Sequence, residues 1–133
     1  MLLENKRIYY VEDNDSNRFI VQLALERHGA ILAYDRRGSY DTILRMKAFA
    51  PIDLILLDLM LAHSMDGYAV LERVRKEPEF EKTPIVAISA ADPAIEIPKA
   101  KEKGFNGFIS KPISGMLLAK QIAQLLEGQP LWE

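Results

Sequence analysis

Short apolar runs recur at similar intervals along this chain of 133 residues. They cover residues 7–11, 30–34, 53–59, 84–90 and 107–110. The runs are rich in Ile, Val, Leu and Tyr, which favours β-strands. The run at 53–59 is apolar on both alternating faces, as is typical of a central strand in a parallel sheet.

The stretches between these runs show the periodicity of amphipathic helices. Helices are predicted over residues 16–29, 39–50, 67–77 and 114–128. The apolar face of the first is expected to contain Phe19, Ile20, Leu23 and Ala24. The inward positions of the last are expected to be Leu117, Leu118, Ile122 and Leu125. Alternating strands and helices predict an α/β protein whose parallel sheet is covered on both faces.

The stretch at 92–104 gives a weaker helical signal because it contains Pro93 and Pro98. Proline inside a helix removes a backbone hydrogen bond and clashes with the preceding turn. We therefore expect a short helix that begins near Pro98, after an irregular lead-in.

Composition fits one soluble globular domain, with 49% hydrophobic and 27% charged residues. A net charge of −2 gives no argument for direct binding of nucleic acid. The absence of cysteine excludes disulfides, thiolate metal sites and a cysteine nucleophile. The apolar runs are too short to cross a membrane, and we expect a cytoplasmic location.

Charged and polar side chains gather where the predicted strands end. Glu12 and Asp13 follow the first strand, Asp58 lies near the end of the third, Ser89 near the end of the fourth, and Lys111 follows the fifth. In parallel sheets these ends form the functional crevice. Clustered carboxylates repel unless a cation joins them, and oxygen ligands suit Mg²⁺. The set suggests phosphoryl transfer to a carboxylate, supported by Mg²⁺ and a lysine.

The segments "YYVEDNDSNR", "PIDLILLDLML", "MDGYAVLERVR", "TPIVAISA" and "GFISKPIS" occur in this order. With them, the chain resembles the receiver domain of bacterial response regulators, the CheY-like family, over about residues 6–127. The resemblance implies a doubly wound (βα)5 flavodoxin-like fold with strand order 2-1-3-4-5 and helices on both faces. The segment "ISKPIS" and the short tail are most similar to the stand-alone, DivK-like group.

The family's metal site maps onto matching positions of this chain. Asp58 takes the place of the phosphoacceptor, and Glu12 and Asp13 match the acidic pair that holds Mg²⁺. Met60 matches the residue whose backbone carbonyl contacts the metal. The resemblance therefore implies an Mg²⁺ site around Asp58.

The family's switch residues map in the same way. Ser89 matches the hydroxyl residue that binds the phosphoryl group. Lys111 matches the lysine that is typical of the family's site, and Phe108 matches the aromatic switch residue. The Lys111–Pro112 peptide is expected to be cis, as is usual in this family. On phosphorylation, Ser89 would move toward the phosphoryl group and Phe108 would turn inward.

The implied function is that of a phosphoacceptor in a two-component system. A histidine kinase or histidine phosphotransfer protein would donate its phosphoryl group to Asp58, and the switched surface would bind an unknown protein target. Homodimerisation is compatible with this function. We expect a signalling component, which assists its own phosphorylation and dephosphorylation, rather than a turnover enzyme. The expected receiver domain spans 1–127, and 128–133 form a tail or the start of a linker, with Leu131 and Trp132 packed on the body or on a partner.

The sequence departs from the family pattern in two places. The loop "LMLAHSMDG", with its departure at Ala62, His63 and Ser64, has Ala62 where proline is customary and one apparent insertion, and His63 is available near the site. We interpret this as a tolerated loop change. Pro98 puts the usual docking geometry of the fourth helix in question.

Two alternatives compete with this interpretation. A degenerate receiver would act as an interaction module without phosphorylation, although the complete set of Asp58, Ser89 and Lys111 argues against it. A haloacid-dehalogenase-type phosphatase would use Asp13 as nucleophile. This interpretation leaves Asp58 unexplained, and the chain lacks the second acidic pair that such a phosphatase needs soon after Lys111.

Overall fold

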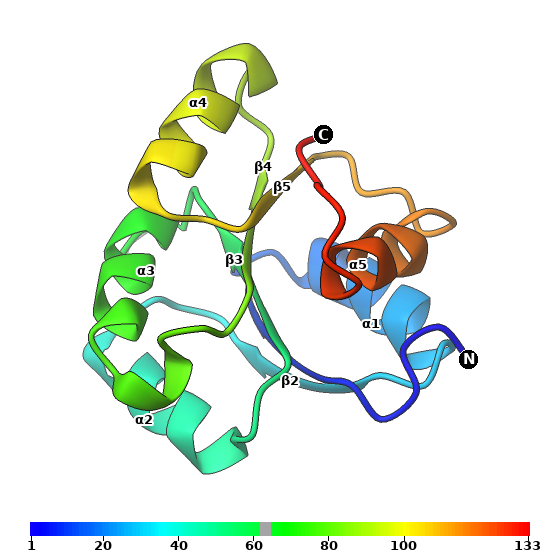
Figure 1. Ribbon diagram of the computed structural model, residues 1–133, viewed down its shortest axis with the longest axis horizontal. Coiled ribbons are helices and arrows are strands. Elements are labelled where there is room, and N and C mark those ends of the chain that lie inside the picture. Colours follow the sequence, from blue (N-terminus) through cyan, green and yellow to red (C-terminus); the bar gives the residue numbers. More distant parts are fainter. Residues whose placement is uncertain (62–64) are drawn as a thin grey trace.

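A parallel five-stranded sheet in the order β2-β1-β3-β4-β5 forms the centre of the computed structural model, which describes residues 1–61 and 65–133 (Figure 1). The strands are β1 (Arg7–Val11), β2 (Ile31–Asp35), β3 (Leu54–Asp58), β4 (Ile85–Ser89) and β5 (Gly107–Ser110). The five predicted strands and the predicted order are confirmed.

Helices cover both faces of the sheet, as predicted. They are α1 (Asp15–Glu26), α2 (Tyr40–Phe49), α3 (Gly67–Arg75), α4 (Pro93–Lys103) and α5 (Leu118–Leu126), with a short 3-10 helix η1 (Pro78–Phe80). Figure 1 shows α1 and α5 on one face, and α2, α3 and α4 on the other. Within the described residues, no helix has the length and apolar character needed to cross a membrane.

The central strand β3 is buried along its whole length. Leu54 and Leu56 point into the core on the α1 and α5 side, whereas Ile55 and Leu57 point into the opposite core. Each such side chain contributes roughly 1.5–3 kcal/mol when it is fully buried. The pairing of β3 with β1 and β4 places its last residue, Asp58, at the carboxyl edge of the sheet.

The predicted apolar face of α1 is confirmed at Ala24 and wrong at Phe19, Ile20 and Leu23. The structure buries Val21, Ala24 and Leu25. In contrast, Phe19, Ile20 and Leu23 are 59%, 41% and 50% exposed. Apolar residues surround more than half of this helix, so its periodicity does not decide which side meets the sheet. Packing against α5 and β2 makes that choice.

The start of α5 also differs from the prediction. The regular helix begins at Leu118 instead of near Ser114, and Leu117 is 52% exposed. Ser114 still closes the preceding turn, because its Oγ accepts a hydrogen bond from the Leu117 N–H at 3.3 Å. Leu118 and Ile122 are buried, as predicted, and Leu125 packs at the edge of the same core.

The prediction for α4 is wrong at its start, because the helix begins at Pro93 and contains Pro98. Pro93 occupies the first helical position, where a missing N–H is harmless, and Asp92 caps the helix by accepting the Ala94 N–H at 3.0 Å. Pro98 can leave only the Ala94 carbonyl without its helical donor. Both residues are exposed, so water can hydrate that carbonyl.

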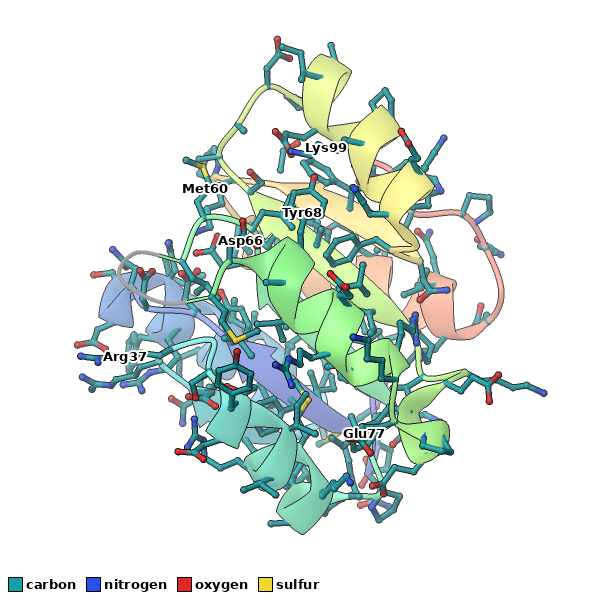
Figure 2. All side chains as sticks on the ribbon, turned by 90° about the vertical axis from the view of Figure 1, so that its left-hand side faces the viewer. Arg37, Met60, Asp66, Tyr68, Glu77 and Lys99 are labelled. Carbon is teal, nitrogen blue, oxygen red and sulfur yellow. The ribbon has the colours of Figure 1, made fainter. Side chains whose placement is uncertain are left out.

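A tertiary contact holds the first turns of α4 in place. The Tyr68 hydroxyl of α3 donates a hydrogen bond to Glu96 Oε2 at 2.7 Å. The Lys99 ammonium lies 4.6 Å from the centroid of the Tyr68 ring (Figure 2). These contacts compensate for the poor helix propensity that Pro98 imposes.

Pro98→Ala is expected to stabilise the protein by about 1–2 kcal/mol. Alanine restores the hydrogen bond to Ala94 and removes the ring clash, while the greater freedom of the unfolded chain offsets part of the gain. Urea denaturation measures the difference. Pro93→Ala is the matched control and should bring no comparable gain, and equal effects of the two substitutions would contradict this account of α4.

The C-terminal residues pack on the body of the protein. Leu131 is 1% exposed. Its carbonyl accepts the Phe108 N–H at 2.8 Å, and the Glu133 N–H donates to the Phe108 carbonyl at 3.0 Å. The segment therefore pairs with the outer edge of β5 through a single parallel bridge, between Trp132 and Phe108.

Candidate functional site

Strand register brings two acids together at the carboxyl edge of the sheet. Val11 of β1 pairs with Leu57 of β3, so the next residues, Glu12 and Asp58, lie side by side. Both are almost fully buried, at 1% and 2% exposure. Two neighbouring buried carboxylates cannot both be ionised without a compensating positive charge.

Lys111 supplies that charge from the loop after β5. Its Nζ lies 3.0 Å from Asp58 Oδ2 and 3.1 Å from Glu12 Oε1. The lysine side chain is itself only 16% exposed, so solvent screens these contacts less than a surface pair. The structure thus joins three of the residues that the sequence analysis selected.

The environment separates the protonation behaviour of the two acids. Burial, followed by the neighbouring Asp58 carboxylate, raises the pKa of Glu12 to about 7, although Lys111 opposes the shift. Burial alone would raise the pKa of Asp58 as well. Contacts with Glu12, the Met60 N–H and Lys111 outweigh that effect and hold the pKa of Asp58 below its ordinary value. Asp58 is therefore the more readily ionised member of the pair.

The same contacts keep the lysine charged. Burial would lower the pKa of Lys111, but the carboxylates of Asp58 and Glu12 raise it above its usual value. A permanently charged ammonium therefore faces the Asp58 carboxylate.

Two further groups position the acids, and neither was predicted from the sequence. The Met60 N–H donates to Asp58 Oδ1 at 2.9 Å, while the Met60 side chain is 64% exposed. The Tyr10 hydroxyl donates to Glu12 Oε1 at 2.9 Å. Tyr10 could have been suspected from its place in an apolar strand, since a buried tyrosine hydroxyl usually needs a polar partner.

Glu12, Asp13 and Asp58 could hold a divalent cation together. Each offers a carboxylate oxygen, and these oxygens lie within 4.8 Å of one another. Asp13 is exposed, so a cation could approach from solvent and keep part of its water shell. Three carboxyl groups against one lysine leave the site short of positive charge, which suits a hard cation with oxygen ligands.

Ser89 ends β4 at the same edge and is fully buried. Its Oγ accepts the Ala91 N–H at 3.0 Å, and its carbonyl accepts the Lys111 N–H at 2.8 Å. The second contact joins Ser89 to the loop that carries the lysine, and the Lys111–Pro112 peptide in that loop is cis, as the resemblance implied.

Phe108 lies in the core on the α3 and α4 side and has no exposed surface. The ring therefore already occupies an inward position in this structure. The unusual loop positions Ala62, His63 and Ser64 fall outside the described residues. On its far side, the loop is anchored by a hydrogen bond from the Met65 N–H to the Gly38 carbonyl at 2.9 Å.

Glu12, Asp58 and Lys111 thus meet at the carboxyl edge of a five-stranded parallel sheet. Residues 8–123 match the family model of the response regulator receiver domain. The chain therefore belongs to the receiver domain family of two-component systems.

Relatives with this domain differ widely in size. The chain is 31% identical to transcriptional regulatory protein CseB of Streptomyces avermitilis over 128 residues, covering 94% of this chain and 51% of CseB. It is 32% identical to hybrid signal transduction histidine kinase D of Dictyostelium discoideum, covering 93% of this chain and 8% of the kinase. The chain thus spans about half of CseB and a small part of the kinase.

The fold matches solved receiver structures. Chemotaxis protein CheY4 of Vibrio cholerae superposes with a TM-score of 0.82 at 21% identity, covering 91% of this chain and 98% of CheY4. At this identity the likeness establishes the shared fold alone. Nothing in these relatives singles out the DivK-like group.

The raised pKa of Glu12 predicts a pH-dependent stability for the metal-free protein. A carboxyl group whose pKa is raised on folding binds more protons in the folded state, so its contribution to stability falls as pH rises from about 4.5 to about 7. In Glu12→Gln, the free energy of unfolding should fall by about 1–3 kcal/mol less over this pH range than in the wild type. Urea denaturation in EDTA between pH 5 and pH 8 measures it.

The matched control is Glu102→Gln, which alters an exposed glutamate of α4. This variant should keep the pH dependence of the wild type. The depressed pKa of Asp58 acts in the opposite sense, because its contribution to stability is lost only when the pH falls below the ordinary pKa of an aspartate. It therefore does not mask the effect of Glu12 between pH 5 and pH 8. A Glu12→Gln profile parallel to that of the wild type would contradict the assignment.

Proposed function

We propose that this chain is a phosphorylatable receiver, which accepts a phosphoryl group on Asp58 from a histidine kinase or a histidine phosphotransfer protein. The observation that carries the proposal is the state of Asp58. It is a buried carboxylate at the end of a core strand, with Lys111 at 3.0 Å and the Met60 N–H at 2.9 Å. These donors favour an ionised, fixed nucleophile.

The chemical step is a substitution at phosphorus. A carboxylate oxygen of Asp58 forms the new P–O bond as the P–N bond to the donor imidazole breaks, and the imidazole nitrogen leaves with the electron pair. Lys111 moves from neutralising the carboxylate to binding a phosphoryl oxygen, and the Ser89 hydroxyl donates to another. The chain's part is positioning and charge stabilisation.

Mg²⁺ is the cofactor that we propose for this step. Glu12, Asp13, Asp58 and the backbone carbonyl of Met60 would hold it, and it would neutralise charge on the transferring group. Glu12 would release its proton when the cation binds, because the cation and the proton compete for the same carboxylate.

Output follows from a change in surface populations. Ser89 drawn toward the phosphoryl group and Phe108 held inward would favour one of two surface states, to which a protein target binds. The domain is in this view a signalling component and not a turnover enzyme. The alternative, a degenerate receiver, finds no support in a site where Glu12, Asp58 and Lys111 are all in contact.

Finer assignments also rest on the family resemblance. We propose that residues 1–127 form the receiver, that the chain is nearest to the DivK-like group through its segment at 109–114, and that it acts in the cytoplasm. A homodimer is compatible with these assignments. The relative that is itself a hybrid histidine kinase supports a kinase as the phosphoryl source.

Labelling with a small phosphodonor tests the site assignment. Acetyl phosphate with Mg²⁺ should label the wild type, and the label should be lost in Asp58→Asn and on addition of EDTA, because both remove a required part of the site. Intact-protein mass spectrometry measures the added phosphoryl group. Asp41→Asn, an exposed aspartate of α2, is the matched control and should be labelled normally.

Two outcomes would count against the proposal. Normal labelling of Asp58→Asn together with loss in Asp13→Asn would favour the phosphatase-like mechanism. Absence of any Mg²⁺-dependent label in the wild type would favour the degenerate receiver.

The exposed apolar face of α1 is the docking surface that we propose for the phosphodonor protein. Phe19, Ile20 and Leu23 form it, and α1 begins at Asp15, just after the acidic pair. A contiguous exposed apolar patch near a reaction site is typical of a protein interface.

Phe19→Ser combined with Leu23→Ser should slow phosphotransfer from a kinase active on the wild type by about tenfold, the size of one or two lost interface anchors. Labelling by acetyl phosphate should remain unchanged, since the site itself is intact. Leu44→Ser, at an exposed leucine of α2, is the control and should transfer like the wild type. Equal slowing with both donors would contradict a docking role.

A further inference from the structure

The C-terminal segment Gln129–Glu133, here named the tail strand, lies along the outer edge of β5. After α5 the chain turns at Gly128, whose φ is 91°, and runs back toward β5 (Figure 1). Phe108 and Trp132 form a parallel pair. Phe108 makes both backbone hydrogen bonds to the tail strand, to Leu131 at 2.8 Å and to Glu133 at 3.0 Å.

Side chains of the tail strand enter both cores, as those of a regular strand do. Leu131 is buried on the α1 and α5 side. Trp132 packs, half-buried, against the opposite core, which contains Phe108. The Lys101 ammonium of α4 lies 5.0 Å from the centroid of a Trp132 ring, within cation–π distance.

The end of the tail strand is tied to two more elements. Ser110 Oγ of β5 donates to the Glu133 carbonyl at 2.6 Å, and Gln121 Nε2 of α5 donates to Glu133 Oε2 at 2.6 Å. The tail strand therefore contacts α4, β5 and α5 at once.

Attachment of the tail strand depends on few groups. Only Leu131 is fully buried, while Gln129, Pro130 and Glu133 are exposed. Ordering such a segment opposes its docking through lost chain entropy. Because the burial of Leu131 and the lost chain entropy oppose each other, the tail strand can be released reversibly while the core stays folded.

The residues held by the tail strand adjoin the phosphoacceptor site. Trp132 pairs with Phe108 on the side away from β4 and packs, half-buried, against the core that contains the Phe108 ring. Ser110, which binds Glu133, pairs with Ser89 across β4 and β5. Ser89 in turn accepts the Lys111 N–H.

We propose that the outer edge of β5 is a strand-docking site, that the tail strand is its ligand, and that docking and ligation of Asp58 stabilise each other. The docked strand keeps Phe108 in its buried position, which is the position that the ligated site favours. This inference rests on the proposed function for the direction of the coupling. Thermodynamic linkage makes this coupling reciprocal. A ligand at Asp58 raises the equilibrium constant for docking of the tail strand by a certain factor, and release of the tail strand lowers the affinity for that ligand by the same factor.

Trp132 is the only tryptophan, so its fluorescence in the full chain reports docking directly. Acrylamide quenching should be slower in the wild type than for N-acetyltryptophanamide, and saturating Mg²⁺ with beryllofluoride, a phosphoryl analogue, should slow it further. Leu131→Ser should release the tail strand and speed quenching. Calorimetry should then show beryllofluoride affinity reduced about fivefold or more.

Leu117→Ser is the matched control, since it changes an exposed leucine just before α5. It should keep both the shielded tryptophan and the affinity of the wild type. Should Leu131→Ser fail to fold, Trp132→Ala replaces it, with hydrogen exchange at the Phe108 amide as the report of docking and the same calorimetric measurement.

Several outcomes would overturn the inference. Trp132 quenched as freely as the free amide would show that the tail strand is not docked. Release of Trp132 with unchanged affinity would show docking without coupling. Shielding that depends on protein concentration, with a dimer in sedimentation, would assign the edge of β5 to a second copy. A wild type that binds no beryllofluoride overturns both the proposed function and the coupling. In that case the shielding of Trp132 from acrylamide still shows whether the tail strand is docked.

Discussion

The contact of Lys111 with Glu12 and Asp58 is the interaction on which this structure depends. A core strand that is apolar on both faces ends in a carboxylate, and a second buried carboxylate lies beside it. Neither acid could stay buried and charged without the ammonium group that bridges them at 3.0 and 3.1 Å. The bridge also joins three strands, because its members follow or end β1, β3 and β5. The same three side chains therefore form the candidate site and hold the ends of these strands together.

That arrangement explains why so much could be predicted from the sequence. An aspartate within "LILLDLML" conflicts with its apolar surroundings, and such conflicts tend to mark functional sites. Strand alternation and the order of the motifs then placed Glu12, Ser89 and Lys111 at the same edge. The prediction succeeded where one dominant pattern, an apolar run with an acid at its end, marked both the central strand and the site.

Prediction failed where the local pattern allowed two answers and tertiary contacts chose between them. Apolar residues surround much of α1, so its periodicity did not distinguish Val21 from Phe19. Proline statistics argued against the first turns of α4, but the hydrogen bond from Tyr68 to Glu96 stabilises them. The Met60 N–H was missed for another reason, since a backbone group leaves no mark in the sequence.

The tail strand also changes what the sheet offers to other chains. An open edge strand presents unpaired N–H and C=O groups and is a template for unwanted strand pairing. The tail strand covers part of β5, and it contains the exposed Pro130, which has no N–H to donate, next to the exposed and polar Gln129. The edge of β5 is thus covered in part by a segment that is itself a poor partner for a further strand. Protection against edge-to-edge association is built into the same few residues that pack beside Phe108.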